Sequence, residues 1–310
     1  MKYMVLVLVT LSSLAWGSEQ PAKISAVRSL NLNQDLQAKR KRAEVFKLVP
    51  HLSANDSWKS VLTIRNDAPH PITLFMEFYD ELGGRPNAVF FGSDDPNLEF
   101  VDSGFVLELA TFEIYSIDFD NLIEDFNSLH IFIFTDETES NYSLEPQYNL
   151  FSGNDKLASV GVAIQEPGDI FIMNEDRRFD PYTQDQRYRG MAVTNTALDT
   201  CQCEIQLFDD QGNSFDASGN AFPDVLLSIP ASGKWVGLTE ELFPEIDFLL
   251  TRGLGYVQFS CDRPVSVLGL AFEGIPVTVS SIPIDYFVAA KTKNPLLQKR
   301  DNRDHWFLRR

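Results

Sequence analysis

The chain has 310 residues, of which 44% are apolar and 23% are charged, and its formal net charge is −18. This length is enough for two domains of roughly 100–150 residues each. Because a strongly acidic chain repels the phosphate backbone, we expect no nucleic-acid partner.

Residues 1–17 are typical of a secretory signal peptide. Lys2 gives the positive start, an apolar run follows from Met4 to Leu14, and Ala15 and Gly17 are the small residues of a cleavage site. An uncleaved membrane anchor is the alternative, but the apolar run is short for a membrane span. We therefore expect a secreted, periplasmic or cell-surface protein with no integral membrane segment after cleavage.

Charge divides the remaining chain into an acidic body and two basic ends. Residues 18–45 form a basic N-terminal segment and residues 289–310 a basic C-terminal tail. Between Val49 and Ala290 the chain has 11 basic and 39 acidic residues. We expect the ends to be solvated peptide. Docking on the acidic body or on an anionic cell surface is the alternative.

The acidic body contains a weak internal repeat with a spacing of 129 residues. Residues 57–84 align without a gap with residues 186–213. Identical residues at matching positions are Asn66 and Asn195, Ala68 and Ala197, Asp80 and Asp209, and Gly83 and Gly212. The repeat indicates a duplicated domain. We place the two domains at residues 46–166 and 167–288.

Short alternating apolar segments between turn signals predict strands in both units. The expected strands are residues 60–66, 72–80, 104–109, 112–118, 128–135 and 157–165, and then 191–195, 201–209, 225–229, 234–238, 255–261 and 265–272. A short helix is expected at Thr239–Phe243, which begins with a capping residue and stops before Pro244. We interpret residues 142–155 as an insertion. The pattern predicts two tandem immunoglobulin-like antiparallel β-sandwich domains.

The three cysteines predict one disulfide. Cys201 and Cys203 lie two residues apart in one strand and so point to the same face. Cys261 ends a strand that is an antiparallel neighbour in the immunoglobulin-like order, and exported proteins form disulfides. We expect Cys261 to pair with Cys201, with Cys203 as the alternative partner. The odd cysteine is either a buried thiol or an intermolecular link, and a metal site built from all three lacks a fourth ligand.

No motif in the sequence predicts an enzyme. The four histidines, His51, His70, His130 and His305, form no metal-binding or triad pattern, and no GxSxG segment is present. Carboxylates are numerous enough to supply a glycosidase-type pair. A carboxylate-dependent hydrolase is therefore the least favoured alternative.

Acidic clusters and two tryptophans are the candidate binding residues. One cluster contains Asp94, Asp95 and Asp102, and another contains Asp136, Glu137 and Glu139. Oxygen ligands on loops suit calcium, which is the only cofactor these residues suggest; a solvated acidic surface is the alternative. Trp58 and Trp235 lie near strand starts, where they predict either ligand platforms or core packing.

The order of motifs resembles exported bacterial tandem β-sandwich repeat proteins. The motifs are Val49-Pro50-His51, Ile64-Arg65-Asn66 and Phe78-Tyr79-Asp80 with Gly83, followed by Leu242–Glu245 and Pro264–Gly269. The resemblance covers most of residues 46–284 and implies a fold without an activity. We expect a non-catalytic structural or interaction module with a protein or cell-surface partner, and a carbohydrate- or calcium-binding module is the alternative. A binding site is expected in the loops of the first unit or in the groove between the units.

Overall fold

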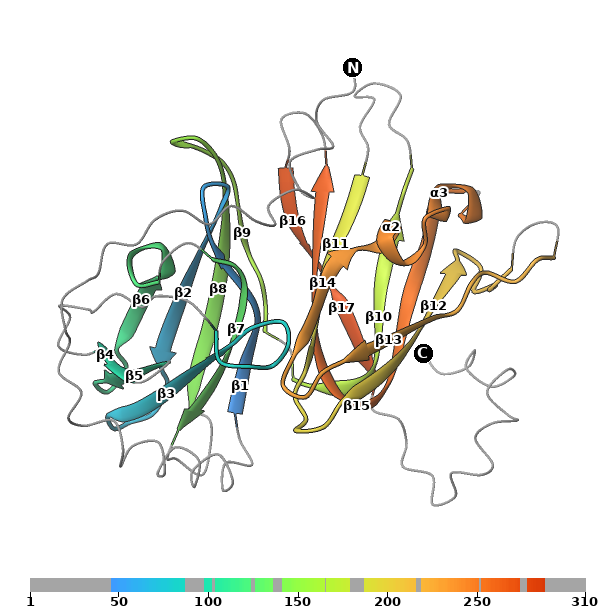
Figure 1. The fold of residues 1–310 in the computed structure, drawn as a ribbon. Coiled ribbons are helices and arrows are strands. Elements are labelled where there is room, and N and C mark those ends of the chain that lie inside the picture. The colour runs from blue at the N-terminus through green and yellow to red at the C-terminus, as the bar shows by residue number, and fades with distance from the viewer. Residues whose placement is uncertain are drawn as a thin grey trace, which may run out of the picture.

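The computed structural model describes residues 46–86, 98–101, 104–123, 126–135, 141–164, 166–178, 187–215, 219–250, 252–273 and 278–287. Over these ranges the chain is all-β, with two antiparallel sheets that follow one another along the sequence (Figure 1). The expected signal peptide and both basic ends lie outside the described residues. In the part that is described, no helix has the length and apolar character needed to cross a bilayer.

The first sheet curls into a half-barrel and the second follows it. The first unit contains β1 (Phe46–Ala54), β2 (Trp58–Asn66), β3 (Ile72–Tyr79), β4 (Leu98–Val101), β5 (Gly104–Leu109), β6 (Ile114–Asp118), the 3₁₀ helix η2 (Phe119–Asn121), β7 (Phe126–Thr135), β8 (Tyr142–Ser152) and β9 (Asp155–Gly161). The second unit contains β10 (Gly168–Asp176), β11 (Arg187–Asn195), β12 (Cys201–Asp209), β13 (Val225–Ile229), β14 (Lys234–Leu238), α2 (Thr239–Leu242), α3 (Ile246–Leu249), β15 (Leu254–Glu273), β16 (Thr278–Ile282) and β17 (Ile284–Phe287).

The two units repeat one strand arrangement. In the first unit β3 lies between β5 and β7, and β2 lies between β6 and β8. In the second unit β12 lies between β13 and β15, and β11 lies between β14 and β15. The register repeats as well, because Ile72 faces Leu109 as Cys201 faces Ile229. The repeat in the sequence therefore corresponds to a repeat in the structure.

The identical asparagines of the repeat hold a turn together. Asn66 is buried, and its Nδ2 donates to two backbone carbonyls at 2.8 Å while its Oδ1 accepts from the N–H of Ala68. Asn195 makes the equivalent bonds at 2.8–2.9 Å in the second unit. A buried amide that satisfies three backbone groups fixes the turn that follows β2 or β11.

The identical Asp and Gly residues form a second turn. Asp80 accepts from the backbone N–H groups two and four residues ahead, both at 2.9 Å, and Asp209 does the same at 2.9 and 2.7 Å. Gly83 and Gly212 have φ values of 78° and 79°, a left-handed conformation that glycine adopts without steric cost. These identities therefore preserve turn geometry.

Each unit buries its own apolar core. In the first, Leu62 of β2 packs in one cluster with Phe78 of β3 and Ile131 of β7. In the second, Ile205 of β12 and Phe259 of β15 belong to the corresponding cluster. Strands that alternate between buried and exposed side chains, such as β12, place one row of apolar residues in this core.

Two expectations about individual segments are wrong. Residues 142–155 are not an insertion, because they contain β8, whose residues 142–150 pair with the full length of β2. The strands expected at residues 255–261 and 265–272 are one strand, β15. Its first half pairs with β10 and β12 and its second half with β11 and β16. Pro264 lies where the neighbours change and where the pairing with β10 shifts register, a position that suits a proline.

The outermost strands differ from the immunoglobulin order. In that order the first strand lies in the sheet of the second strand, and the last strand lies in the sheet of the sixth. Here β1 pairs mainly with β7, and β8 pairs with β2. What the structure shows is therefore an all-β fold with two antiparallel sheets, whose outermost strands do not follow the immunoglobulin order.

Candidate functional site at the junction of the two units

The two units contact one another through an apolar cluster. Tyr148 of β8 and Val160 of β9 pack with Leu268 and Leu270 of β15. The edge strands β9 and β16 lie side by side (Figure 1). Burial of large apolar side chains between units stabilises their relative position. The junction is thus part of the folded core.

Two turns interlock at the junction. The turn at residues 80–84 of the first unit meets the turn at residues 230–233 of the second, where the N–H of Lys234 donates to the carbonyl of Glu81 at 3.0 Å. A Cβ atom on Gly83 would lie 1.9 Å from the carbonyl oxygen of Ala231, and one on Gly233 would lie 2.7 Å from that of Glu81. Glycine is therefore required on both sides for this close approach.

Lys234 extends from this turn into the junction. Its side chain is almost fully buried, with 4% of the residue exposed. The Nζ atom donates to the carbonyl of Leu129 at 2.6 Å and lies 3.2 Å from Nδ1 of His51. Burial removes water from the ammonium group and lowers the pKa of Lys234 to about 7, although the charge of Glu81 raises it. The amine therefore titrates near neutral pH.

Two histidines of the first unit lie against this amine. His130 is fully buried and stacks on Tyr79, and its Nε2 donates to the carbonyl of Ser232 at 2.8 Å. Burial and the nearby Lys234 lower the pKa of His130 to about 3. The same two causes, in the same order, hold the pKa of His51 well below its usual value. Both rings are therefore neutral at pH 7, and Nδ1 of His130 is buried without a hydrogen-bond partner among the described residues.

A small pocket lies at another part of the junction. Its volume is about 290 Å³, just below the usual range for ligand sites. The lining residues are Phe46, Glu166, Pro167, Thr196, Ala197 and Pro264. Lys234, His51 and His130 do not line this pocket. The titratable cluster is therefore not presented to a molecule bound there.

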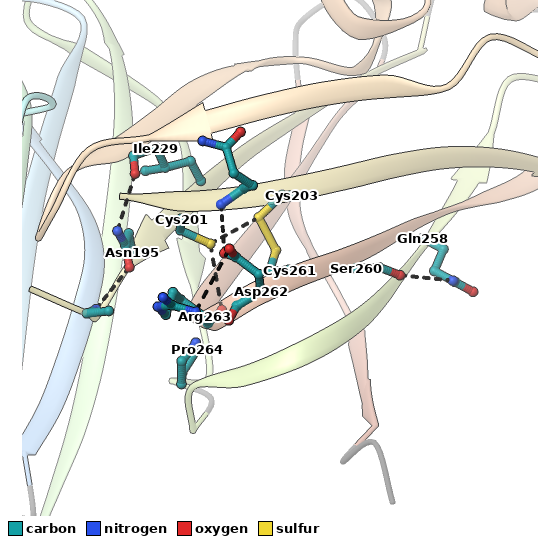
Figure 2. Close-up of a disulfide and its surroundings, with 12 residues drawn as sticks. Asn195, Cys201, Cys203, Ile229, Gln258, Ser260, Cys261, Asp262, Arg263 and Pro264 are labelled. Carbon is teal, nitrogen blue, oxygen red and sulfur yellow. Dashed lines mark hydrogen bonds and ion pairs between the residues drawn. A yellow bond between two sulfur atoms is a disulfide. The ribbon is translucent and has the colours of Figure 1, made fainter. Parts of the chain in front are cut away.

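A cluster of three sulfur atoms lies between β12 and β15 (Figure 2). Cys203 faces Cys261 directly in the strand register, and these two form the disulfide. Cys201 is a buried free thiol, with its Sγ atom 3.7 Å from that of Cys203. The preferred pairing of Cys261 with Cys201 is corrected, because the alternative partner Cys203 forms the bond. Diagonal cross-strand neighbours have Cα atoms about 7–8 Å apart, beyond the usual reach of a disulfide.

The tryptophans expected as platforms make contacts within the molecule. Trp58 meets Phe272 edge-on across the junction, with ring centroids 6.0 Å apart. Trp235 is partly buried and packs against the core of the second unit. The acidic residues expected to bind calcium, Asp94, Asp95, Asp102, Asp136, Glu137 and Glu139, lie outside the described residues. The calcium site stays a prediction.

Two carboxylates converge on Arg177 in the second unit. Glu175 lies 3.0 Å from Nε of this arginine, and Glu240 bonds to Nη1. Glu175 is buried, and burial raises its pKa against the opposing effect of Arg177. The Thr239 hydroxyl donates to Glu175 at 2.7 Å. These carboxylates surround a buried arginine, whereas a glycosidase pair must flank a sugar.

The role of Gly233 and Lys234 at the junction was not predicted from the sequence. The available signal was local: the second unit has Gly233 and Lys234 where the matching register of the first unit has Glu113 and Ile114. A glycine followed by a lysine reads as an ordinary exposed turn. Gly233 and Lys234 join the two units only because the turn at residues 80–84 and the carbonyl of Leu129 lie against them.

Comparisons of the chain with protein-family models, curated proteins and solved structures gave no match. Function is therefore inferred from the residues and geometry of this chain.

Proposed function

We propose that this protein is an exported, non-catalytic structural or interaction module that binds a protein or cell-surface partner. The observation that carries the proposal is the junction. Its reactive side chains, Lys234, His51 and His130, are enclosed between the units and directed at one another and at backbone carbonyls. A general acid or base must lie within hydrogen-bond reach of its substrate, and the buried position of these groups favours a role in holding the units together.

The hydrogen bonds at the junction support a fixed arrangement of the two units. They join Lys234 to Glu81 and Leu129, His130 to Ser232, and Thr194 to Pro50. Every one of these bonds has a backbone carbonyl as its acceptor. Such bonds depend on the position of the whole turn or strand, so they resist sliding of one unit over the other. A rigid pair of units can present surfaces on both to one partner.

Exposed edge strands supply the proposed binding surface. Over the described ranges β6 pairs with β2 alone and β13 with β12 alone. Ile114 on β6 is 63% exposed and Leu226 on β13 is 77% exposed. An open edge with apolar side chains can accept a strand from another chain. We therefore propose strand addition as the mode of partner binding.

The test is capture of a partner from the exported fraction of the native host by the purified mature protein. Lysine at Ile114 or Leu226 should abolish capture, because charged edge residues oppose strand pairing. Leu198→Lys is the matched control, since Leu198 is 76% exposed but lies in the turn between β11 and β12. Capture that is unchanged by both edge variants, or equally lost with Leu198→Lys, would contradict the proposal.

We also propose that each unit is a member of the immunoglobulin-like sandwiches with its outer strands exchanged, related to the exported bacterial tandem β-sandwich repeat proteins. In this comparison β2 and β3 take the places of the second and third immunoglobulin strands, and β6 and β7 those of the fifth and sixth. The pairing of β2 with β6 and of β3 with β7 supports the proposal, because the second and fifth strands and the third and sixth strands share sheets in that fold. The test is an experimental structure of the mature chain, in which β1 must pair with β7.

A further inference from the structure

The three cysteine sulfurs form a compact group next to the core of the second unit. Their Sγ atoms all lie within 4.8 Å of one another. The Cys203–Cys261 disulfide is already formed, and the thiol of Cys201 lies 3.7 Å from Cys203 Sγ (Figure 2). A thiol in contact with a disulfide is the arrangement from which thiol–disulfide exchange starts.

We propose that this cluster is an internal thiol–disulfide exchange site that moves the free thiol from Cys201 to Cys261 and makes Cys261 a site of modification by disulfide-bearing molecules. The Cys201 thiolate attacks Cys203 Sγ. The Cys201–Cys203 bond forms as the Cys203–Cys261 bond breaks, and Cys261 takes up the proton that Cys201 lost. The step rearranges bonds without net oxidation or reduction, so it needs no external oxidant or reductant.

Strand geometry selects Cys203 as the sulfur that is attacked. Cys201 and Cys203 are two residues apart in β12, so their Cα atoms are about 6.4–6.8 Å apart. That separation falls at the upper end of the usual disulfide range of about 4.4–6.8 Å. Cys201 and Cys261 are diagonal neighbours at about 7–8 Å, outside that range. Exchange therefore releases Cys261 and leaves Cys203 bonded.

The exchange brings a thiol closer to solvent. Cys201 and Cys203 are fully buried, whereas Cys261 is partly exposed and is followed by the exposed Asp262. In a second step the Cys261 thiolate attacks a small disulfide R–S–S–R. A Cys261–S–S–R bond forms, and R–S⁻ leaves. The chain then carries Cys201–Cys203 as its internal disulfide and a modified Cys261.

The environment of Cys201 makes the first step slow at neutral pH. Burial raises the pKa of its thiol to about 11, although a backbone hydrogen bond with Arg263 lowers it. At pH 7 roughly one Cys201 in ten thousand is then a thiolate, and the fraction rises about tenfold for each pH unit. The exchange rate should follow this fraction.

The test uses the mature protein with dithiobis(nitrobenzoate), an aromatic disulfide that releases one coloured thiolate for each cysteine it modifies. We expect one equivalent of release, a rate that rises about tenfold between pH 7.5 and 8.5, and an adduct that peptide mass spectrometry places on Cys261. Cys201→Ser keeps the Cys203–Cys261 bond and should show no adduct. An adduct on Cys201, no release at either pH, or equal modification of Cys261 in Cys201→Ser would overturn the proposal.

A second variant tests the rearranged bond itself. Cys261→Ser leaves Cys201 and Cys203 as the two cysteines of the chain. With excess oxidised glutathione as the oxidant, the variant should form the Cys201–Cys203 disulfide and lose both free thiols as two glutathione molecules are released. Circular dichroism verifies that the variant is folded. A folded variant that becomes glutathionylated without forming this disulfide would contradict the proposed step.

Discussion

Replacement of Gly83 by alanine should weaken the junction while leaving both cores unchanged. Residue 83 has φ of 78°, so alanine costs about 1–2 kcal/mol in any setting. Its Cβ would also lie 1.9 Å from the carbonyl oxygen of Ala231. The two turns must then separate, which adds about 1–3 kcal/mol of steric strain. Loss of the bond from Lys234 N–H to Glu81 adds about 0.5–1.5 kcal/mol.

Gly212→Ala is the matched control for this prediction. Gly212 has φ of 79° in the same Asp-stabilised turn of the second unit, so alanine there carries the same conformational cost. Urea unfolding, followed by fluorescence, should show Gly83→Ala to be less stable than Gly212→Ala by about 2–4 kcal/mol. Equal free energies of unfolding for the two variants would refute the view that these turns interlock.

Three further predictions concern buried polar groups and sulfur. The pKa of Lys234 in the folded state is about 7, below its usual 10.5, so between these pH values the unfolded state binds more protons and stability rises with pH. The difference in unfolding free energy between the wild type and Lys234→Met should therefore increase by about 3 kcal/mol from pH 7 to 9.5. A difference that does not change with pH would exclude a lowered pKa for this lysine. Alanine at both Cys203 and Cys261 should lower the urea unfolding free energy by about 2–4 kcal/mol, whereas reduction of the wild type without any loss would contradict a structural disulfide. Asn66→Ala leaves buried backbone groups unpaired and should cost about 2–4 kcal/mol in thermal or urea unfolding; a loss below that range would show that the turn does not depend on this amide.

Local patterns in the sequence were sufficient to predict much of each unit. Strands at residues 104–109, 225–229 and 234–238 have the expected bounds, because alternating apolar residues are flanked by turn signals there. β8 was missed because Pro146 interrupts its pattern and no comparable motif marks its counterpart in β15. The pairing of β1 with β7 and of β8 with β2 is long-range, and periodicity alone does not encode it.

The candidate site was less predictable than the strands. The sequence placed Cys201 and Cys203 correctly on one face of their strand, and both are fully buried. It could not decide which of them pairs with Cys261, because that choice depends on the strand register. The local signal at Lys234, a glycine followed by a lysine, indicates only an exposed turn. The lowered pKa of Lys234 arises from enclosure by residues more than a hundred positions earlier in the chain, such as Leu129.

Hydrogen exchange at the backbone N–H of Lys234 tests the central claim that the two units form one rigid body. This N–H donates across the junction to the carbonyl of Glu81 at 3.0 Å. If the junction is as stable as the cores, the Lys234 amide should be protected to the same degree as amides within β11 and β12, and Gly83→Ala should remove that protection selectively. Exchange in the wild type at the rate of an exposed turn would contradict the account.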